Sequence, residues 1–344
     1  MIYIRTDMNA TVATGHVMRC LSIADAVREL GEETVFLVAD EEPVEFLRDR
    51  GYASIVLQSD WRNMDGELPI LMKVIEDNGI KELFIDSYQV TQNYLQTLKK
   101  HIKVCYLDDL NRFEYPVDTL ICYDNYYEKF DYPAHLQDVK LYLGMQYAPL
   151  RAVFRDCPVK QISPRAMNLL LLSGGTDPYH ILKRLLNALA PDKRSERWKI
   201  TVICGGMNQD YEQIRSDYEG INNVSVFRQV NDIENYMQEA DIAVSAGGST
   251  LYELCACGTP AITYAFADNQ LENVWQFAED GLIPYTGDLR KDDVIGKVVR
   301  LLEDLRDDQK LREERSVRMQ NLIDGRGAIR IAQVLVAQEK TGRV

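Results

Sequence analysis

The sequence predicts an α/β protein built from two doubly wound, Rossmann-like parallel-sheet domains that face each other across a cleft. The chain of 344 residues is too long for one ordinary core and fits two domains of about 150 residues each. Short apolar strands alternate with amphipathic helices in both halves, the rhythm of parallel βαβ units. That rhythm stops near residues 150–166, at Cys157-Pro158 and Ser163-Pro164, and then restarts.

The first predicted domain covers residues 1–155. Amphipathic stretches at Glu42–Arg50 and Tyr94–Lys100 separate apolar runs with the length and composition of buried strands. The expected strands are Ile2–Ile4, Thr34–Val38, Ser54–Leu57, Glu82–Ile85, Lys103–Leu107 and Thr119–Ile121.

The second predicted domain covers residues 160–322 and ends in two helices, at about Lys291–Leu305 and Asp307–Leu322. A last amphipathic stretch, about residues 325–344, is expected to pack back on the first domain. A ligand is expected between the two domains, where such sites commonly lie. The expected strands are Asn168–Leu172, Lys199–Cys204, Val224–Phe227, Ile242–Val244 and Ala261–Tyr264.

Charge and hydropathy limit the kinds of molecule that the protein is expected to bind. The net charge of −14, from 53 acidic and 39 basic side chains, opposes binding to nucleic acid or to an anionic membrane. Met1 leads directly into a short strand instead of a signal peptide, and no apolar run approaches the ~20 residues needed to span a bilayer. We expect a cytoplasmic protein with a small-molecule substrate and no stable membrane insertion; a monomer is favoured, although the sequence leaves the oligomeric state open.

The cysteines are seven in number, an odd count, and most stand in apolar stretches. They are typical of reduced, buried side chains. Cys255 and Cys257 lie within a predicted helix and have no second Cys/His pair nearby, so we expect neither a metal site nor a cofactor.

His16 is the strongest catalytic candidate. It follows the Ala13-Thr14-Gly15 turn and precedes Val17, Cys20 and Leu21, which recur at helical spacing. It should therefore lie at a helix N-terminus, at the carboxyl edge of the sheet where ligands of open α/β folds bind. A helix N-terminus disfavours the imidazolium form, so His16 is expected to act as a neutral base.

Other polar residues follow strands that end at the same edge. Asp7 is expected to orient His16 or the attacking water, and Tyr88 to bind a sugar. Asp108 and Asp109 are expected to cap a helix or face solvent. The remaining candidates for sugar contacts in this domain are Arg5, Asn9 and Gly15.

Two glycine loops in the second domain suggest a nucleotide site. In Ser245–Thr250, Gly247 and Gly248 let the backbone approach a ligand, and the first helical turn, with Ser249 and Thr250, offers donors to a phosphate. Glu253, one turn further on, is placed to accept hydrogen bonds from a ribose. The alternative is a tight turn with Ser249 as helix N-cap.

The second glycine loop, Ser173–Pro178, contains Gly174, Gly175 and Thr176 and offers another wall for a diphosphate. As structure alone it is a βα turn whose Asp177-Pro178 starts a helix. Asn269 and Gln270 carry amides suited to sugar hydroxyls or a diphosphate, with simple capping by Asp268 as the alternative. Neither glycine loop has the Walker A or G-x-G-x-x-G pattern.

Taken together, these segments resemble the PseG family. The resemblance rests on Arg5–Asp7, Thr14–Leu21, Tyr147–Arg151, Ser173–Pro178, Ala246–Glu253 and Asn269-Gln270, in the same order along nearly the whole chain. Spore coat polysaccharide proteins named SpsG are similar to the same family. The chain departs from the family pattern at Ala13, where glycine is frequent, and at Met8, where serine or alanine is common.

The resemblance implies a GT-B fold like that of MurG-type glycosyltransferases. It implies metal-independent hydrolysis of a UDP-activated 2,4-diacetamido-2,4,6-trideoxy sugar at the anomeric carbon, with inversion, in pseudaminic acid biosynthesis. It carries the catalytic histidine onto His16 and the nucleotide loop onto Gly247, Gly248, Ser249 and Glu253. Two rivals stay open: a glycosyltransferase in which His16 deprotonates an acceptor hydroxyl, and a nucleotide-sugar-binding protein without activity.

Overall fold

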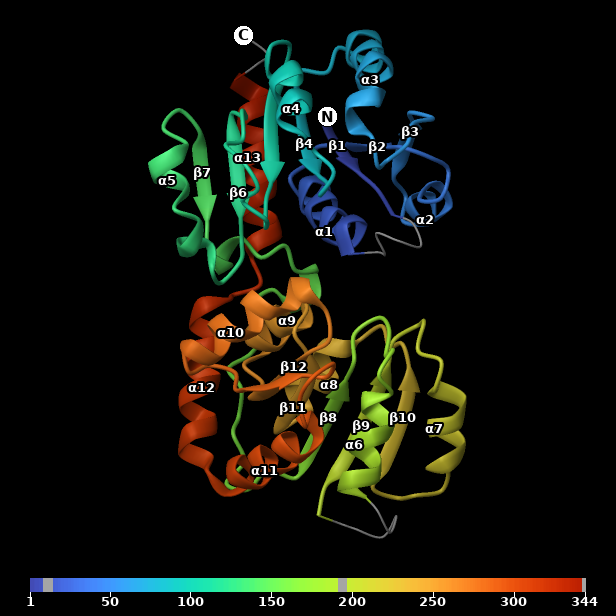
Figure 1. The fold of residues 1–344 in the computed structure, drawn as a ribbon, viewed down its shortest axis with the longest axis vertical. Helices are drawn as coiled ribbons and strands as arrows, with labels where there is room; N and C mark the ends of the chain where they lie inside the picture. The colour runs from blue at the N-terminus through green and yellow to red at the C-terminus, as the bar shows by residue number, and fades with distance from the viewer. Residues whose placement is uncertain (9–14, 191–196, 342–344) are drawn as a thin grey trace. The chain divides into compact units, whose positions relative to one another are not determined.

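The computed structural model describes residues 1–8, 15–190 and 197–341 of the chain. It divides into two compact units (Figure 1). Unit 1 consists of Met1–Ala152 with Gly325–Val344, and unit 2 consists of Val153–Asp324. The chain therefore leaves unit 1 once and returns to it with its last helix.

Unit 1 is built on a seven-stranded parallel sheet with the strand order β3-β2-β1-β4-β5-β6-β7. The interior strand β1 buries Ile2 and Ile4 on one face, and Ile4 stands opposite Phe36 and Phe84 of its two neighbours. The strands are β1 (Ile2–Thr6), β2 (Thr34–Val38), β3 (Ala53–Val56), β4 (Glu82–Asp86), β5 (Lys103–Leu107), β6 (Thr119–Cys122) and β7 (Lys140–Leu143).

Helices cover both faces of this sheet. Polar caps start two of them: the Asn63 side chain accepts a hydrogen bond from the N–H of Gly66, and that of Thr91 from the N–H of Tyr94. The helices are α1 (Gly15–Glu29), α2 (Val44–Arg48), α3 (Met64–Asn78), α4 (Gln92–Lys99), α5 (Tyr132–His135) and α13 (Gly327–Thr341), with short 3₁₀ turns at Tyr127–Phe130 and Met145–Tyr147.

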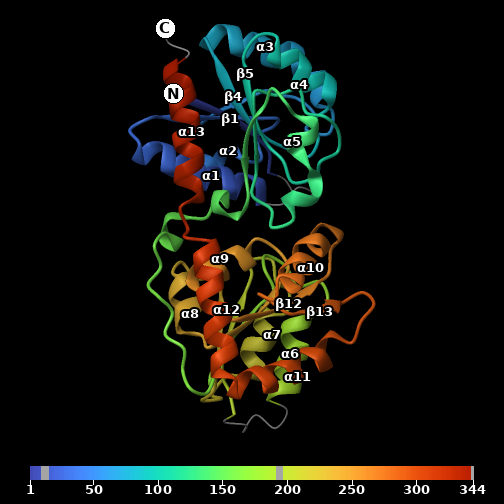
Figure 2. The same ribbon diagram turned by 90° about the vertical axis from the view of Figure 1, so that its left-hand side faces the viewer.

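The last helix, α13, belongs to unit 1 and packs beside α1 (Figures 1 and 2). Its first residue, Gly327, passes so close to the backbone that a Cβ there would lie 2.1 Å from the carbonyl oxygen of Ala148. Near its other end, the amide of Gln338 donates to the hydroxyl of Thr119 in β6 at 3.1 Å. The helix is thus fixed at both ends.

Unit 2 repeats the plan with a six-stranded parallel sheet in the order β10-β9-β8-β11-β12-β13. The Asp293 and Asp308 side chains cap the two long helices near its end. The strands are β8 (Asn168–Leu172), β9 (Lys199–Cys204), β10 (Val224–Arg228), β11 (Ile242–Ala246), β12 (Ala261–Ala265) and β13 (Tyr285–Asp288). The helices are α6 (Ile181–Leu189), α7 (Tyr211–Asp217), α8 (Ile233–Glu239), α9 (Thr250–Cys257), α10 (Leu271–Glu279), α11 (Val294–Asp307) and α12 (Gln309–Leu322), with 3₁₀ turns at Ala152–Phe154 and Asp268–Gln270.

The predicted fold class is confirmed: both units are doubly wound parallel α/β structures. Two edge strands, β7 and β13, were not predicted from the sequence. Every residue of β7 is at least partly exposed, so the strand lacks a buried apolar run, and β13 is Tyr-Thr-Gly-Asp, which carries turn residues.

Each sheet has a point at which the strand order reverses. The reversal lies between β1 and β4 in unit 1 and between β8 and β11 in unit 2. Loops leaving the carboxyl ends of these strand pairs turn to opposite faces of the sheet, which opens a crevice where ligands of such folds bind. His16, Tyr88 and the two glycine loops singled out from the sequence follow the strands at these two points.

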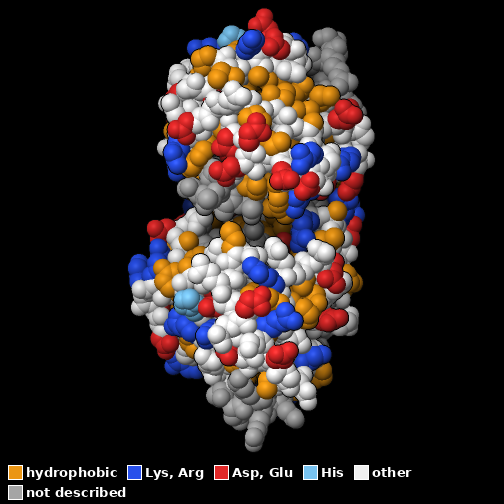
Figure 3. Space-filling view, turned by 90° about the vertical axis from the view of Figure 1, so that its right-hand side faces the viewer, with side chains coloured by type: hydrophobic (Ala, Val, Ile, Leu, Met, Phe, Trp, Pro, Cys, Tyr) orange, Lys and Arg blue, Asp and Glu red, His pale blue; other side chains and the backbone are white. Residues whose placement is uncertain are grey.

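None of the helices within the described ranges is long and apolar enough to cross a membrane. On the face drawn in Figure 3, acidic and basic side chains are interspersed over both units.

The packing of α13 predicts that its core side chains stabilise unit 1. Leu335 of α13 is fully buried, so Leu335→Ala should lower the free energy of unfolding of unit 1 by about 2–5 kcal/mol. The exposed Gln333 of the same helix provides the control, since Gln333→Ala should change it by less than about 0.5 kcal/mol. Urea unfolding followed by circular dichroism measures both. Equal stability of the two variants would contradict the assignment of α13 to the core of unit 1.

Candidate active site

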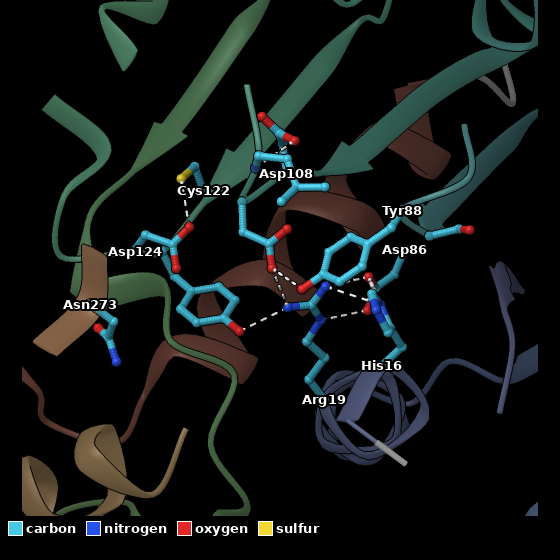
Figure 4. Close-up of polar contacts among 12 residues, drawn as sticks. His16, Arg19, Asp86, Tyr88, Asp108, Cys122, Asp124 and Asn273 are labelled. Carbon is cyan, nitrogen blue, oxygen red and sulfur yellow. Dashed lines mark hydrogen bonds and ion pairs between the residues drawn. The ribbon is translucent and has the colours of Figure 1, made fainter. Parts of the chain in front are cut away.

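His16 is the second residue of α1 and lies at the switch point of unit 1. Its Nδ1 is 2.5 Å from Oδ1 of Asp86, the last residue of β4 (Figure 4). The ring is only 6% exposed. With Nδ1 bonded to a carboxylate, the neutral imidazole carries its proton on Nδ1, and Nε2 is the nitrogen that can accept a proton.

Arg19 binds the same carboxylate beside His16, with its Nη2 3.1 Å from Nδ1 of the imidazole. Its Nε and Nη2 donate to the two oxygens of Asp86 at 2.6 and 2.5 Å, a bidentate pair. Its Nη1 donates to the hydroxyl of Tyr123 at 2.9 Å and to Asp109 at 3.1 Å. Arg19 follows His16 by three residues, so both side chains lie on one face of α1.

These contacts decide the charge of Asp86. Burial by itself would raise the pKa of this carboxyl, but Arg19 and His16 beside it hold the pKa well below its usual range. Asp86 therefore stays ionised. An ionised carboxylate on Nδ1 fixes the orientation of the ring and stabilises the imidazolium that forms when Nε2 takes up a proton.

Tyr88 packs edge-on against the imidazole, with ring centroids 4.4 Å apart. Its hydroxyl donates to Asp109 at 2.8 Å, and burial together with Asp109 raises the pKa of Tyr88. The phenol is thus neutral and hydrogen-bonded beside the catalytic candidate. This places Tyr88 at the predicted position, next to His16.

Carboxyl groups line the rest of this edge. Asp124 follows β6 and is buried, and burial together with the charge of Asp109 raises its pKa well above the usual range. Asp108 has a different role, since its oxygens accept hydrogen bonds from the N–H groups of Leu110 and Asn111 and close the turn after β5. Asp108 is therefore a buried turn cap, and only Asp109 of the pair reaches the site.

The structure corrects two expectations about strand β1. Arg5 is fully buried, with Nε and Nη2 each 2.8 Å from the carboxylate of Glu67, so it supports the sheet instead of contacting a sugar. Asp7 does not orient His16: it pairs with Arg5 at 2.7 Å and accepts from the N–H of Ala39. The apolar sheet interior around Arg5 demands these counter-charges, which is why the carboxylate after β1 turns inward.

Two further predictions concern the loop before α1. Gly15 opens α1 and is exposed, with no heavy atom within 4 Å of the place where a Cβ would stand. Asn9 lies outside the described residues. The sugar contacts predicted for both stay predictions.

In unit 2 the loop after β11 depends on a close backbone approach. A Cβ at Gly247 would lie 2.2 Å from Cγ1 of Val274, so only glycine fits. The side-chain amide of Asn273 donates to the Gly247 carbonyl at 3.0 Å, and the Gly247 N–H donates to the Tyr264 carbonyl at 2.9 Å. The backbone is thereby fixed just before α9 begins.

The segment just before α9 is accessible to a ligand, although the N–H groups of Leu251 and Tyr252 in the first turn already donate to the carbonyls of Gly248 and Ser249 at 3.1 and 3.0 Å. Gly248 has open space around it, Ser249 is exposed and Thr250 is half-buried. Ser249 stands at the N-cap position of α9, as the alternative had it, but its hydroxyl makes no capping hydrogen bond. Glu253, one turn on, is half-buried. Helix N-terminal N–H groups in such a place favour an anion.

The second glycine loop follows the neighbouring strand β8. Gly174 takes a left-handed φ of +78°, and both Gly174 and Gly175 are exposed while Thr176 is half-buried. The helix α6 starts at Ile181, three residues after the predicted start at Asp177-Pro178, and the Asp177 side chain accepts hydrogen bonds from the N–H groups of Ile181 and Leu182 in its first turn. The hydroxyl of Ser173 is buried and has no hydrogen-bond partner among the described residues.

Asn269 and Gln270 lie in the 3₁₀ turn after β12, on the far side of β11. Asn269 is exposed. The carbonyl oxygen of the Gln270 side chain accepts from the N–H of Phe266 at 2.9 Å, so that oxygen holds the loop and the NH₂ group remains for a ligand. Asp268 pairs with Arg290 instead of capping α10.

Sequence reasoning missed the roles of Asp86, Arg19 and Asn273. Two signals were present: Asp86 ends the strand that pairs with β1, and Arg19 stands three residues after His16. Asn273 lies inside a helix, where nothing in the sequence marks it as the partner of a glycine carbonyl 26 residues away. Within the described ranges, no group of three or more His, Cys, Asp or Glu side chains is arranged to hold a metal ion.

Comparison with solved structures identifies the fold class of the two units. The fold of the two units is that of GT-B glycosyltransferases: the chain superimposes on Acinetobacter baumannii MurG with a TM-score of 0.71 at 13% identity, covering 98% of this chain and 100% of that one. A glycosyltransferase of kitacinnamycin gives a TM-score of 0.68 at 14% identity, with 98% of both chains covered.

Sequence comparison adds a family match and particular relatives. Residues 169–323, nearly all of unit 2, match the glycosyltransferase family 28 C-terminal domain. The chain is 22% identical to the spore coat polysaccharide biosynthesis protein SpsG of Bacillus subtilis over 332 residues, 93% of each protein. It is 36% identical over 121 residues, a third of each protein, to the UDP-N-acetylglucosamine–N-acetylmuramyl-(pentapeptide) pyrophosphoryl-undecaprenol N-acetylglucosamine transferase of Helicobacter pylori. The SpsG similarity predicted from the sequence is confirmed.

The Arg5–Glu67 pair predicts a large effect of one substitution. Glu67 is fully buried, so Glu67→Gln removes one of the two carboxylates that compensate the buried guanidinium, the other being Asp7, and should lower the free energy of unfolding by about 1.5–3 kcal/mol. The exposed pair Glu45–Arg48 is the control, since Glu45→Gln should have little effect. Urea unfolding of unit 1 measures both, and equal stability would contradict the structural role of Arg5.

Glu67 also predicts how stability depends on pH. Burial alone would raise its pKa, but hydrogen bonds and charge from Arg5, with help from Ser59 and Tyr94, lower it below the usual value. A carboxyl with a depressed folded-state pKa stabilises the fold above its unfolded pKa, about 4.3, and loses that contribution as the pH falls toward the folded value. Unfolding titrations between pH 6 and 3 should therefore fall more steeply for the natural protein than for Glu67→Gln. Parallel curves would exclude Glu67 as a source of acid sensitivity.

Proposed function

We propose that the protein hydrolyses a UDP-activated 2,4-diacetamido-2,4,6-trideoxy sugar at its anomeric carbon, with inversion, for the synthesis of a pseudaminic-acid-type nonulosonate. The observation that carries this proposal is the buried His16–Asp86–Arg19 arrangement at the switch point of unit 1. It supplies an oriented base at the edge where ligands of this fold class bind. The glycine loops of unit 2 supply a site suited to a diphosphate.

In the proposed reaction, Nε2 of His16 removes a proton from a water molecule. The water oxygen bonds to the anomeric carbon as the carbon–oxygen bond to the diphosphate breaks, and the bonding electrons leave with UDP. Asp86 stabilises the imidazolium through Nδ1, and such general-base action contributes roughly 10²–10⁴-fold. Donors on the loops at Gly247–Thr250 and Gly174–Thr176 stabilise the charge that grows on the departing diphosphate.

The nucleotide part of the proposal has two supports. One is the geometry around Gly247, where Asn273 and the contact with Val274 fix the backbone ahead of an open helix N-terminus. The other is the match of residues 169–323 to the family 28 C-terminal domain, together with relatives whose names specify UDP-N-acetylglucosamine as donor. We propose that Glu253 accepts hydrogen bonds from the ribose hydroxyls. Asn269 and Gln270 are proposed to make further contacts with the sugar or the diphosphate.

The charge around His16 favours an uncharged sugar in unit 1. Asp86, Asp109 and Asp124 lie at this edge with Arg19 as their nearest cation. A phosphate-bearing acceptor would meet the carboxylates of Asp86 and Asp109 there, while Asp124, whose raised pKa favours the neutral carboxyl, adds no negative charge. Hydroxyl and acetamido groups would find hydrogen-bond partners and the ring of Tyr88. This supports water as the nucleophile over a lipid-linked pyrophosphate acceptor.

A glycosyltransferase is the second candidate, favoured by the structural and sequence relatives that carry this activity in their names. The two functions are separated by incubating the purified protein with the UDP-linked altropyranose derivative, EDTA and no acceptor. Release of UDP over many turnovers supports the hydrolase. UDP release that starts only when an acceptor is added supports the transferase.

Substitution of the base should separate catalysis from binding. His16→Ala should lower turnover by about 10²-fold or more while leaving UDP affinity within about twofold. Asp86→Asn should also lower turnover, because the ring loses its ionised partner. Steady-state kinetics and calorimetric UDP titration measure these effects, with Glu45→Gln as a remote control. Turnover near normal in His16→Ala would remove His16 from the mechanism.

A matched pair of glycine variants tests the nucleotide loop. Gly247→Ala places a Cβ against Val274 and Gln270, so the loop must shift, and we expect UDP affinity to fall by about tenfold or more, equal to 1.4 kcal/mol. Gly220→Ala is the control: a Cβ there meets no atom of the described residues within 4 Å, and although the left-handed φ of +75° strains an alanine and lowers stability, UDP affinity should stay unchanged. Isothermal titration with UDP measures both. Unchanged binding by Gly247→Ala would place the nucleotide elsewhere.

A further inference from the structure

Two cysteines of unit 2 that are distant in sequence lie in contact. The Sγ atoms of Cys157 and Cys257 are 3.9 Å apart, although 100 positions separate them. Cys257 is buried at the last position of α9, while Cys157 is half-buried. The other five cysteines of the chain are all buried. Cys157 is therefore the thiol that a small oxidant in solvent can reach.

One side-chain amide keeps the two cysteines in place. Gln320 of α12 donates through Nε2 to the carbonyl of Pro158 at 3.0 Å and to that of Ala256 at 3.3 Å. Its Oε1 accepts from the N–H of Lys160 at 3.1 Å. Pro158 and Ala256 are the chain neighbours of Cys157 and Cys257, so the contact between the thiols is built into the packing of α12.

The C-terminal end of α9 also packs against the Gln320 side chain. Gly258 follows Cys257 with a left-handed φ of +66°, and a Cβ there would lie 2.6 Å from the Gln320 side chain. The Gln238 side chain donates to the Cys257 carbonyl at 2.9 Å. The backbone on both sides of the buried thiol is thus fixed, and only side-chain rotation and small shifts remain.

We propose that Cys157 and Cys257 form a redox modification site, which hydroperoxides convert to an intramolecular disulfide. The pair takes no part in the hydrolysis proposed above, so it stands or falls independently of that function.

The chemistry balances with hydrogen peroxide as the oxidant. The Cys157 thiolate attacks one peroxide oxygen, forming a sulfenic acid and releasing hydroxide, which takes up the thiol proton to give water. The Cys257 sulfur then attacks the sulfenic sulfur, the S–O bond breaks, and a second water leaves with the Cys257 proton. The two thiols lose two electrons and two protons together, and the peroxide is reduced to two waters.

The contact between the thiols gives them these two roles. The hydrogen bond from the Cys257 thiol lowers the pKa of Cys157, and the same contact together with burial raises the pKa of Cys257. The half-buried Cys157 thiol is therefore the nucleophile toward peroxide, and the buried Cys257 thiol resolves the sulfenic acid. A disulfide requires the sulfurs to approach from 3.9 Å to about 2 Å.

The disulfide would fix the start of unit 2 to the end of α9. The other end of this helix follows Gly247–Ser249 of the candidate nucleotide loop. Cross-links that close long loops stabilise a fold mainly by restricting its unfolded chain. Oxidation should therefore make unit 2 more resistant to heat, and reduction should reverse the effect.

The test compares the reduced, desalted protein before and after treatment with a slight excess of hydrogen peroxide. We expect the intact mass to fall by two hydrogens and a non-reducing peptide map to join the peptides of Cys157 and Cys257. We expect the thermal midpoint to rise by about 5 °C or more and to return with dithiothreitol.

Two variants provide the controls. Cys157→Ser, at a half-buried position, should abolish both the linked peptide and the thermal shift. Cys255→Ala, which changes a buried cysteine of the same helix, should retain both. The inference is overturned if both thiols stay free, if Cys157 proceeds to sulfinic acid without a linked peptide, or if the linkage forms equally in Cys157→Ser.

Discussion

The carboxylate of Asp86 is the point on which the candidate site of unit 1 depends. It ends β4 beside the central strand β1, and it is shared by the imidazole of His16 and the guanidinium of Arg19. A buried carboxylate without these partners would be costly and would take up a proton. With them it remains ionised, and its charge sets both the tautomer and the orientation of the ring. The position of Asp86 at the end of β4 therefore determines how His16 can take part in the proposed proton transfer.

The two units share one topology, but different types of residue line their polar edges. In each, the strand order reverses beside the first strand, and the loops that follow form a polar edge. Unit 1 fills its edge with carboxylates, an arginine and a histidine, which suits proton transfer. Unit 2 fills its edge with glycines and a helix N-terminus, which suits an anion. A nucleotide-activated sugar carries both requirements in one molecule, which is the reason for proposing such a substrate.

Much of the fold could be predicted from the sequence because buried parallel strands are continuous apolar runs. Thr34–Val38, Lys103–Leu107, Asn168–Leu172 and Lys199–Cys204 have the predicted bounds. Edge strands such as Tyr285–Asp288 were not predicted because they lack a continuous apolar run. The return of the last helix to unit 1 was predictable from its apolar face, since a helix with such a face needs a partner.

The site was only partly predictable. His16, Tyr88 and the glycine loops stood out because glycine turns and strand ends are visible in a sequence. Which carboxylate faces the histidine was not visible: Asp7 and Asp86 both follow strands at one edge, and only the buried charge of Arg5 draws Asp7 away. The contact between Cys157 and Cys257 depends on the packing of α12 and could not have been found from spacing.

We propose that water, activated by His16, attacks the anomeric carbon of a UDP-activated sugar. Running the reaction in water enriched in oxygen-18 and measuring the masses of both products shows which bond is broken. The label is expected in the anomeric hydroxyl of the released sugar, and UDP is expected to stay unlabelled. Label in the phosphate of UDP would show attack at phosphorus and would contradict the mechanism.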